Sequence, residues 1–210
     1  MKLYTFPVAP NPTKVRLYLA EKAAAGCRIP LEEIPVNLVK GEQRSPEHRA
    51  RNPFATLPVL ETDSGDFLIE SLPIIEYLEE LFPEPSMLGP DPESRAVARQ
   101  LERIADLGVL IPIARIVHAT DSPVGHPANP AVADYYRKRL PPGLGHLEER
   151  LADGRAWLAG ERVTVADCTL AAALQFGRLR KLDFLDGYPR LAAWDVRYRQ
   201  RGPAVSILVL

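Results

Sequence analysis

Two short polar motifs in the first third of the chain are candidates for holding an anion. Asn11 stands directly before Pro12, and Glu70 directly before Ser71, each where the pattern predicts the start of a helix. The first backbone N–H groups of a helix have no partner within it and lie at the positive end of its dipole, so they attract anions. The same residues are also good plain helix caps, and the sequence leaves both roles open.

The cysteines do not indicate disulfide or metal chemistry. The chain has two, Cys27 and Cys168, which are too few for a disulfide framework or a metal cluster. No cysteine occurs in residues 5–13, which lead into the first predicted helix. We therefore expect no metal cofactor.

The composition is that of an ordinary globular protein and excludes several classes of partner. Of 210 residues, 46% are apolar and 25% charged. The 26 basic and 27 acidic residues give a net charge of −1, without the basic excess of a nucleic-acid-binding protein. No apolar run approaches the ~18 residues of a membrane span, and the N-terminus lacks the apolar core of a signal peptide. We expect a cytoplasmic protein that binds neither nucleic acid nor membrane.

Proline is unusually frequent, and its positions divide the chain. The sequence contains 21 prolines, a share about twice the typical ~5%. Residues 83–92 hold several of them together with Gly89, a combination that bars both a helix and a central strand. This predicts a linker at 83–92 between an N-terminal domain, 1–82, and a C-terminal domain, 93–210.

The N-terminal part alternates between strand and helix patterns. Strands are predicted at 2–6, 34–38, 57–62 and 67–70, and helices at about 12–25 and 72–82. We expect Asn11 to cap the first helix and Ser71 the second. A β–α–β unit followed by a hairpin and a helix requires one parallel and one antiparallel pairing, so the predicted sheet is four-stranded and mixed.

The C-terminal part shows helical periodicity alone. Helices are predicted at 93–119, 131–140, 144–151, 165–179 and from about 189 onward. We expect Pro112 to kink or interrupt the first of these, and Pro141-Pro142 to separate the second from the third. Thr164 and Asp167 form a capping box that opens the helix at 165, a structural role.

Four stretches, taken in chain order, resemble a cytosolic glutathione transferase. They are Pro10–Leu17, Asn52-Pro53 leading to Leu57–Leu60, Glu70-Ser71, and Trp157–Gly160 with Thr164–Asp167. Each alone is a common pattern, but all four in order around a proline-rich linker are specific, and the resemblance covers essentially the whole chain. It is strongest with bacterial, nu-like members. The resemblance implies a thioredoxin-like domain followed by a helical domain, usually in a two-fold dimer.

The resemblance also implies where glutathione binds. In the family, the proline matching Pro58 is cis and leaves the backbone of Leu57 free to pair with the cysteine of glutathione, as an added strand does. A trans proline at a strand start is the alternative from sequence alone. Glu70 and Ser71 match the residues that hold the γ-glutamyl end, and Gln43 matches the position that contacts the glycyl end.

The group that would stabilise the thiolate departs from the family pattern. Family members use a Tyr at the end of the first strand, or a Ser, Thr or Cys just before the first helix. Here Thr5 stands at the Tyr position, and Tyr4, one residue away, points to the other face of the strand. Ala9 stands at the Ser or Thr position of nu-like members and cannot donate a hydrogen bond. Asn11 is therefore the candidate, while a pure capping role for it, with activation by Thr5 or Thr13, is the alternative.

Together these features imply a homodimeric glutathione transferase with glutathione as its co-substrate. Glutathione would be bound by Asn11, Gln43, Leu57, Pro58, Glu70 and Ser71. Its thiolate would attack an electrophile, or would reduce a disulfide or peroxide with the help of a second glutathione. We expect the long helix around residues 109–118 to line the pocket of the second substrate. The alternative, favoured by Ala9, is a non-catalytic binding protein of the same fold.

Overall fold

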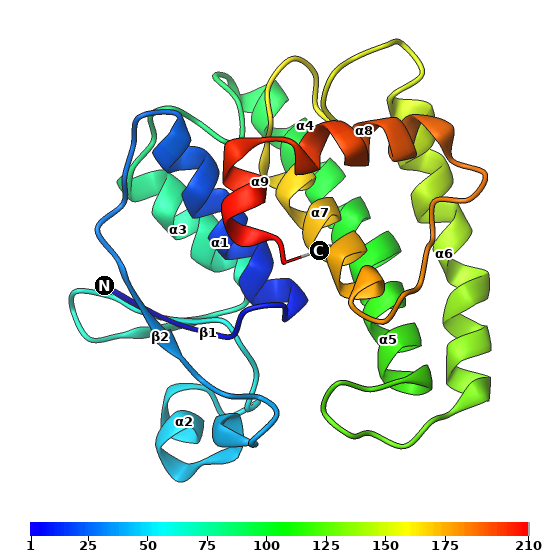
Figure 1. The fold of residues 1–210 in the computed structure, drawn as a ribbon. Coiled ribbons are helices and arrows are strands. Elements are labelled where there is room, and N and C mark those ends of the chain that lie inside the picture. Colours follow the sequence, from blue (N-terminus) through cyan, green and yellow to red (C-terminus); the bar gives the residue numbers. More distant parts are fainter. Residues whose placement is uncertain (210) are drawn as a thin grey trace.

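The computed structural model describes residues 1–209 and contains a sheet-bearing N-terminal domain and an all-helical C-terminal domain (Figure 1). Leu210, the last residue of the predicted helical domain, lies outside the described part. The strands are β1 (Lys2–Thr5), β2 (Glu32–Pro35), β3 (Val59–Glu61) and β4 (Phe67–Ile69), in the spatial order β2-β1-β3-β4. β1 is parallel to β2 and antiparallel to β3, which confirms the predicted four-stranded mixed sheet.

The two faces of the sheet are covered differently. Leu3 and Leu60 belong to the main core beneath α1 (Pro10–Ala24) and α3 (Ser71–Leu81). Tyr4 lies on the opposite face in a small second cluster, with the guanidinium of Arg51 at the end of α2 (Pro46–Arg51) 4.4 Å from its ring centre. The Tyr4 hydroxyl donates to the Glu61 carboxylate at 2.6 Å. Tyr4 is therefore packed away from α1, as the strand alternation predicted.

The structure corrects the predicted second strand and adds helices after it. The strand is Glu32–Pro35 rather than 34–38, because Asn37 starts a turn and its side-chain oxygen accepts from the N–H groups of Val39 and Lys40, both at 3.0 Å. A 3₁₀ turn, η1 (Glu42–Arg44), and α2 follow. Ser45 caps α2 by accepting from the N–H of His48.

The C-terminal domain is built around α7 (Val165–Arg178), which is buried along almost its whole length. Its other helices are α4 (Pro92–Ala105), the π-helical segment η2 (Asp106–Leu110), α5 (Ile111–Thr120), α6 (Pro130–Arg150), α8 (Pro189–Arg199) and α9 (Gly202–Ile207). The predicted Thr164–Asp167 capping box is present. Asp167 also accepts from the Leu158 N–H and the Trp194 indole, and its complete burial raises the pKa of its carboxyl. No helix in residues 1–209 has the length and apolar character needed to cross a membrane.

The prolines of the helical domain have two different effects. Pro112 lacks an N–H, so the α-helical bond to Gly108 cannot form, and the predicted interruption takes the form of η2 just before it. The prediction that Pro141-Pro142 would break a helix was wrong, because α6 runs through both. Gly143 rests so closely on Gly108 that an added Cβ would lie 2.5 Å from the Gly108 carbonyl oxygen. This packing of α6 on η2 outweighs the two lost hydrogen bonds.

Buried charges on α1 join the two domains. The Lys14 ammonium, with its side chain fully buried, lies 2.7 Å from the Glu102 carboxylate of α4 and 3.5 Å from Asp106 of η2. Two turns farther along, Glu21 pairs with Arg201 before α9 at 2.6 Å. A buried charge is costly without its partner, so each pair fixes α1 against the helical domain.

Removing one partner of the Lys14–Glu102 pair should destabilise the protein strongly. Lys14→Ala removes the nearest cation from the buried Glu102 carboxylate, which keeps only the Arg103 guanidinium at 3.6 Å and the Thr169 hydroxyl, and we expect the free energy of unfolding to fall by about 3–5 kcal/mol. The double variant Lys14→Met/Glu102→Leu should recover most of this loss because it removes both charges. Urea unfolding measures both effects. As a control, Arg137→Ala breaks an exposed pair with Asp134 and should cost about 1 kcal/mol or less. A single variant no less stable than this control would contradict the expectation.

Candidate active site

One edge of the sheet brings together three of the motifs that could hold a ligand. β3 pairs with both neighbours through Val59, which lies opposite Tyr4 of β1 and Ile69 of β4. The next residues along these strands, Thr5, Pro58 and Glu70, therefore lie at the same edge. α1 begins a few residues after β1 and α3 directly after Glu70, so both helices start at this edge (Figure 1).

The start of α1 differs from the prediction in a way that exposes one amide. The helix begins at Pro10 with Ala9 as its N-cap, so Asn11 is the second helical residue and not the cap. The reason is that Pro10 is preset for the first helical position. Pro10 and Pro12 have no N–H, and the N–H of Thr13 bonds the Ala9 carbonyl at 2.9 Å. Within the first turn, the N–H of Asn11 therefore remains available to a ligand, beside its own side-chain amide.

Ser71 connects the starts of the two helices. Its hydroxyl donates to the Asn11 side-chain oxygen across 3.4 Å, a long hydrogen bond between residues 60 positions apart. Since the oxygen of the Asn11 amide faces Ser71, its NH₂ group is turned to other acceptors. Ser71 itself is buried and is the first residue of α3, with Glu70 in the N-cap position that we predicted for Ser71.

Glu70 is held in a backbone conformation that side chains rarely adopt. Its φ is 69° and its ψ is 125°, outside the regions that non-glycine residues favour. Its carboxylate is exposed and forms no ion pair within residues 1–209. Pro73 lacks an N–H, so the first turn of α3 offers the free N–H groups of Ser71 and Leu72 beside this carboxylate. The arrangement suits a ligand end that carries both a carboxylate and an ammonium group.

The Leu57-Pro58 motif presents free backbone at the head of β3. The peptide bond between the two residues is cis. Neither the N–H nor the C=O of Leu57 has a hydrogen-bond partner in the described chain, whereas the neighbouring loop is well braced. Asn52 is completely buried, donates to the Thr56 carbonyl and hydroxyl at 3.0 and 2.9 Å, and accepts from the Phe54 N–H. Sequence reasoning missed this positioning role of Asn52, although Asn52-Pro53 belongs to one of the four stretches that carry the resemblance.

The remaining predicted residues are Gln43 and the possible thiolate-stabilising residues Thr5, Thr13 and Ala9. Gln43, in η1, is buried, and its side-chain oxygen Oε1 has no partner in residues 1–209. No hydrogen bond within residues 1–209 joins it to Asn11 or Ser71. The hydroxyls of Thr5 and Thr13 are also buried without a partner in the described chain, so both retain a proton to donate. Ala9 is buried and offers none.

The protein's own thiols lie outside this cluster. Cys168 is buried in the middle of α7, where burial raises the pKa of its thiol well above the usual range. Cys27 is half-buried after the end of α1 and forms no disulfide. The described residues contain no group of three His, Cys, Asp or Glu placed to share a metal ion.

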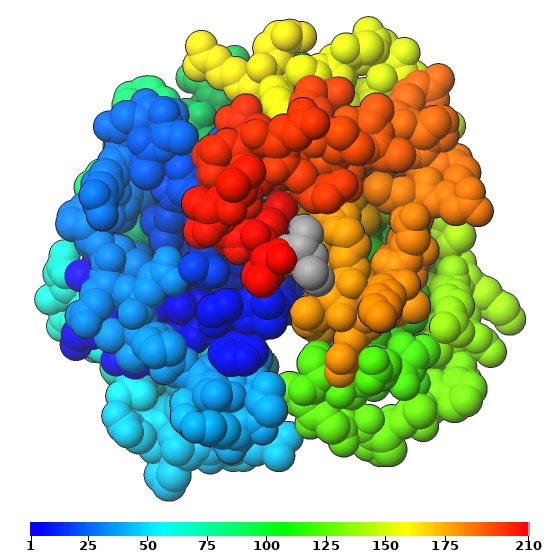
Figure 2. Space-filling view, in the orientation of Figure 1, coloured from blue at the N-terminus to red at the C-terminus, as the bar shows by residue number. Residues whose placement is uncertain are grey.

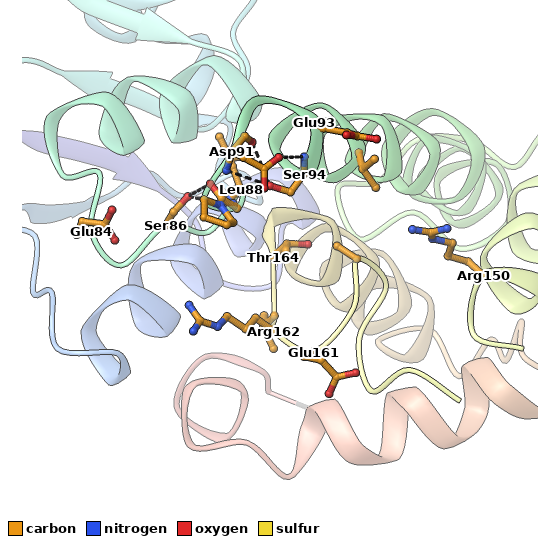
Figure 3. A pocket seen from close by; sticks show the side chains of 15 residues that line it. Glu84, Ser86, Leu88, Asp91, Glu93, Ser94, Arg150, Glu161, Arg162 and Thr164 are labelled. Atoms are coloured by element: carbon orange, nitrogen blue, oxygen red, sulfur yellow. Dashed lines mark hydrogen bonds between the residues drawn. The ribbon is translucent and has the colours of Figure 1, made fainter. Parts of the chain in front are cut away.

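A cavity lies away from this edge of the sheet, and none of the predicted site residues lines it. Its volume is about 540 Å³, and segments 84–94 and 159–164 form its walls together with Arg150. Figure 3 shows Asp91 and Ser94 bonded to each other on its rim, as the capping box of α4. The side chains of Asp91 and Ser94 are thus already used in hydrogen bonds that cap α4. We therefore place the candidate active site at the edge of the sheet and not in this cavity.

Comparison with known proteins agrees with this architecture. The family model of the glutathione S-transferase N-terminal domain matches residues 3–86, and that of the C-terminal domain matches residues 96–194. Glutathione S-transferase 2 of Saccharomyces cerevisiae is 31% identical over 100% of this chain and 89% of its own length. Maleylacetoacetate isomerase of Pseudomonas aeruginosa is 33% identical over 97% of this chain and 96% of its own. The crystal structure of Gtt2 from Saccharomyces cerevisiae is 30% identical, covers 99% of this chain and 100% of that one, and superposes with a TM-score of 0.88.

The positive φ of Glu70 leads to a prediction about stability. Glu70→Gly should raise the free energy of unfolding by about 1 kcal/mol, because glycine adopts this conformation without steric cost and that gain exceeds its greater loss of backbone entropy. Thermal or urea unfolding measures the change. The matched control is Glu80→Gly, at an exposed position inside α3, which should lower stability by about 0.5–1 kcal/mol. Equal destabilisation by both variants would show that Glu70 carries no strain.

Proposed function

Because the chain belongs to the glutathione transferase family, we propose that this enzyme binds glutathione where α1 and α3 begin and uses its thiolate to attack an electrophile. The observation that carries the proposal is the Ser71–Asn11 hydrogen bond, which joins the two helix starts beside the free backbone of Leu57. Each part of glutathione then meets a group of matching chemistry.

The backbone and the polar side chains divide the tripeptide between them. The cysteine residue of glutathione pairs with the N–H and C=O of Leu57, ahead of cis-Pro58, as an added strand does. The γ-glutamyl carboxylate accepts from the first amides of α3 and from the Ser71 hydroxyl, and Glu70 accepts from the γ-glutamyl ammonium group. Gln43 binds the glycyl end, and its buried Oε1, which has no partner in residues 1–209, supports this role.

Asn11 stabilises the sulfur anion. A free thiol has a pKa of about 8.5, so most of it is protonated at neutral pH, and only the thiolate is a strong nucleophile. The NH₂ group and the backbone N–H of Asn11 donate to the sulfur at the positive end of the α1 dipole and lower the thiol pKa. The thiol proton leaves to solvent. The sulfur then forms a bond to the electrophilic carbon, and the leaving group departs with the electron pair of its broken bond.

The proposal extends to the organisation of the chain and to its location. We assign residues 1–82 to the glutathione-binding domain, 83–92 to the linker and 93–210 to the helical domain. The end of α3 at Leu81 and the start of α4 at Pro92 support this division. Both cysteines are free thiols, which suits a cytoplasmic enzyme.

The role of Asn11 predicts a shift in the titration of bound glutathione. Hydrogen bonds to charged groups contribute about 1.5–3 kcal/mol, so Asn11→Ala should raise the pKa of the bound thiol by about one to two units. The ultraviolet absorbance of the thiolate, measured against pH with glutathione bound, gives this pKa. Turnover of 1-chloro-2,4-dinitrobenzene at neutral pH should fall in parallel, because less thiolate is present.

Matched variants separate Asn11 from the other donors. Thr5→Val and Thr13→Val each remove a buried hydroxyl with almost no change in volume and should leave the titration where it is. If one of them moves the pKa and Asn11→Ala does not, the activating group is that threonine. A Glu70→Ala/Ser71→Ala variant with unchanged glutathione affinity would contradict the proposed binding site.

We further propose that two copies form a homodimer through the groove between α4–α5 and α6. The groove has a volume of about 1170 Å³ and exposes Leu107 and Tyr135, which are 55% and 54% accessible. Phe54, 71% accessible in the N-terminal domain, is a further exposed apolar side chain for such a contact. Light scattering at micromolar concentration should give twice the chain mass of 23.3 kDa. Leu107→Arg should lower this mass, and a monomer mass for the native chain would overturn the proposal.

A further inference from the structure

A buried histidine contacts the loop before the Leu57-Pro58 motif and has no part in the chemistry described so far. His48 lies in α2 and is almost completely buried, with 1% of its surface exposed. Its ring nitrogen Nε2 lies 3.1 Å from the carbonyl oxygen of Thr56, the residue before Leu57. Because a carbonyl oxygen only accepts hydrogen bonds, Nε2 carries the proton and donates it.

The Thr56 carbonyl is held by two side chains at once. The NH₂ group of Asn52 donates to the same oxygen at 3.0 Å. A carbonyl oxygen has two lone pairs, so protein donors occupy both of them here. The two donors are themselves connected, since the backbone N–H of Asn52 donates to the His48 carbonyl at 2.9 Å. α2 and the turn after it therefore hold this one oxygen from two positions.

Holding the Thr56 carbonyl also sets the direction of the Leu57 N–H. The two groups belong to one peptide bond, which is trans, and in a planar trans peptide the N–H points opposite to the C=O. The oxygen is turned toward His48 and Asn52, so the N–H is turned away from them. No group in residues 1–209 accepts a hydrogen bond from this N–H. It is thus both fixed in direction and available to a ligand.

The loop needs this support because its backbone is strained. Ala55, directly before Thr56, has a φ of 53°, in the left-handed region that alanine rarely adopts. Such a conformation persists only where the surrounding structure holds it. Without the His48 hydrogen bond, the peptide between Thr56 and Leu57 loses one of its two restraints, and its N–H is less well aimed.

The second ring nitrogen of His48 indicates what the side chain contributes. Nδ1 is buried and has no hydrogen-bond partner in the described chain. A buried polar atom without a partner is a cost to folding, and an apolar side chain of similar size would avoid it. Such a side chain could not donate to Thr56. The contribution that is specific to histidine here is the Nε2 hydrogen bond.

We propose that His48 is a positioning residue for glutathione, which acts through the Thr56 carbonyl to aim the Leu57 N–H at the carbonyl oxygen of the glutathione cysteine. The inference rests on the proposed function, in which Leu57 pairs with that cysteine residue. The contact is made before and after the thiol ionises and reacts, so it contributes equally to the ground state and the transition state. Its loss therefore raises KM for glutathione and leaves kcat at saturation unchanged.

The position of α2 makes His48 accessible to substitution without loss of the fold. Figure 2 shows the light-blue segment that contains α2 at the lower margin of the N-terminal domain, beside a hollow bordered by green atoms of the helical domain. None of residues 46–51 belongs to the main hydrophobic core. We therefore expect variants at position 48 to keep the two domains folded, which circular dichroism and urea unfolding verify.

Two substitutions at this position test the inference. His48→Leu removes the donor and should raise KM for glutathione by about 3- to 10-fold, the effect of one neutral hydrogen bond. With 1-chloro-2,4-dinitrobenzene as electrophile, kcat at saturating glutathione should stay within about twofold of native, and the pKa of the bound thiol should not move. His48→Gln keeps an NH₂ donor of similar reach and should restore KM to within about twofold of native. If His48→Leu does not fold, His48→Met is the second donor-free variant, because its flexible side chain adapts to the same space.

A control in the same helix separates aiming of the N–H from stability of α2. Arg51→Gln removes the ion pair with Glu47 and leaves the Thr56 carbonyl untouched, so the dissociation constant of glutathione, measured by calorimetry, should not change. Unchanged affinity in His48→Leu overturns the inference alone. Equal weakening in His48→Gln or in Arg51→Gln also overturns it, since the helix and not the hydrogen bond is then responsible. If the native protein binds no glutathione in the calorimeter, the proposed function fails and the inference fails with it.

Discussion

The buried ion pairs of α1 are the constraint on which the rest of the structure depends. Lys14 meets Glu102 and Asp106, and Lys22 meets Glu79 of α3 at 2.9 Å, the carbonyl of Phe82 at the end of α3 and the carbonyl of Pro85. Because α1 is fixed against the sheet, α3 and the helical domain, its first turn has a single position relative to all three. Such pairs add little net stability over apolar packing, but a helix placed in another register would leave their charges buried and unpaired.

The same placement explains why the candidate site needs few side chains. The starts of α1 and α3 meet at one edge of the sheet, and prolines remove most of the competing amides of their first turns. The site thus consists largely of backbone N–H groups, oriented by the fold, and of a few polar side chains that orient one another. Asn52 orients backbone in the same way, because its buried amide donates to Thr56 and so fixes the loop before Leu57.

Local sequence patterns were sufficient to predict most helices and strands. They did not predict the exact residues at which these elements start, or short helices such as α2 that lack a strong apolar period. The mixed sheet and the Thr164 capping box could be predicted because each depends on neighbouring residues. Two proline effects could not. Pro141-Pro142 stays inside α6 because Gly143 packs against Gly108, a contact between distant segments, and Asn11 lost its expected cap position to Ala9 because Pro10 starts the helix. The residues of the candidate site were found through motifs, whereas the Ser71–Asn11 contact depends on how two helices meet.

The presence of alanine at position 9, the N-cap of α1, has a chemical consequence. Without a hydroxyl at the N-cap, the donors near the start of α1 are the amides of Asn11 and the buried hydroxyls of Thr5 and Thr13, since Lys14, the nearest cation in sequence, is already bound to Glu102 and Asp106. A thiolate whose pKa is lowered only moderately keeps more of its nucleophilicity than one held by a full positive charge.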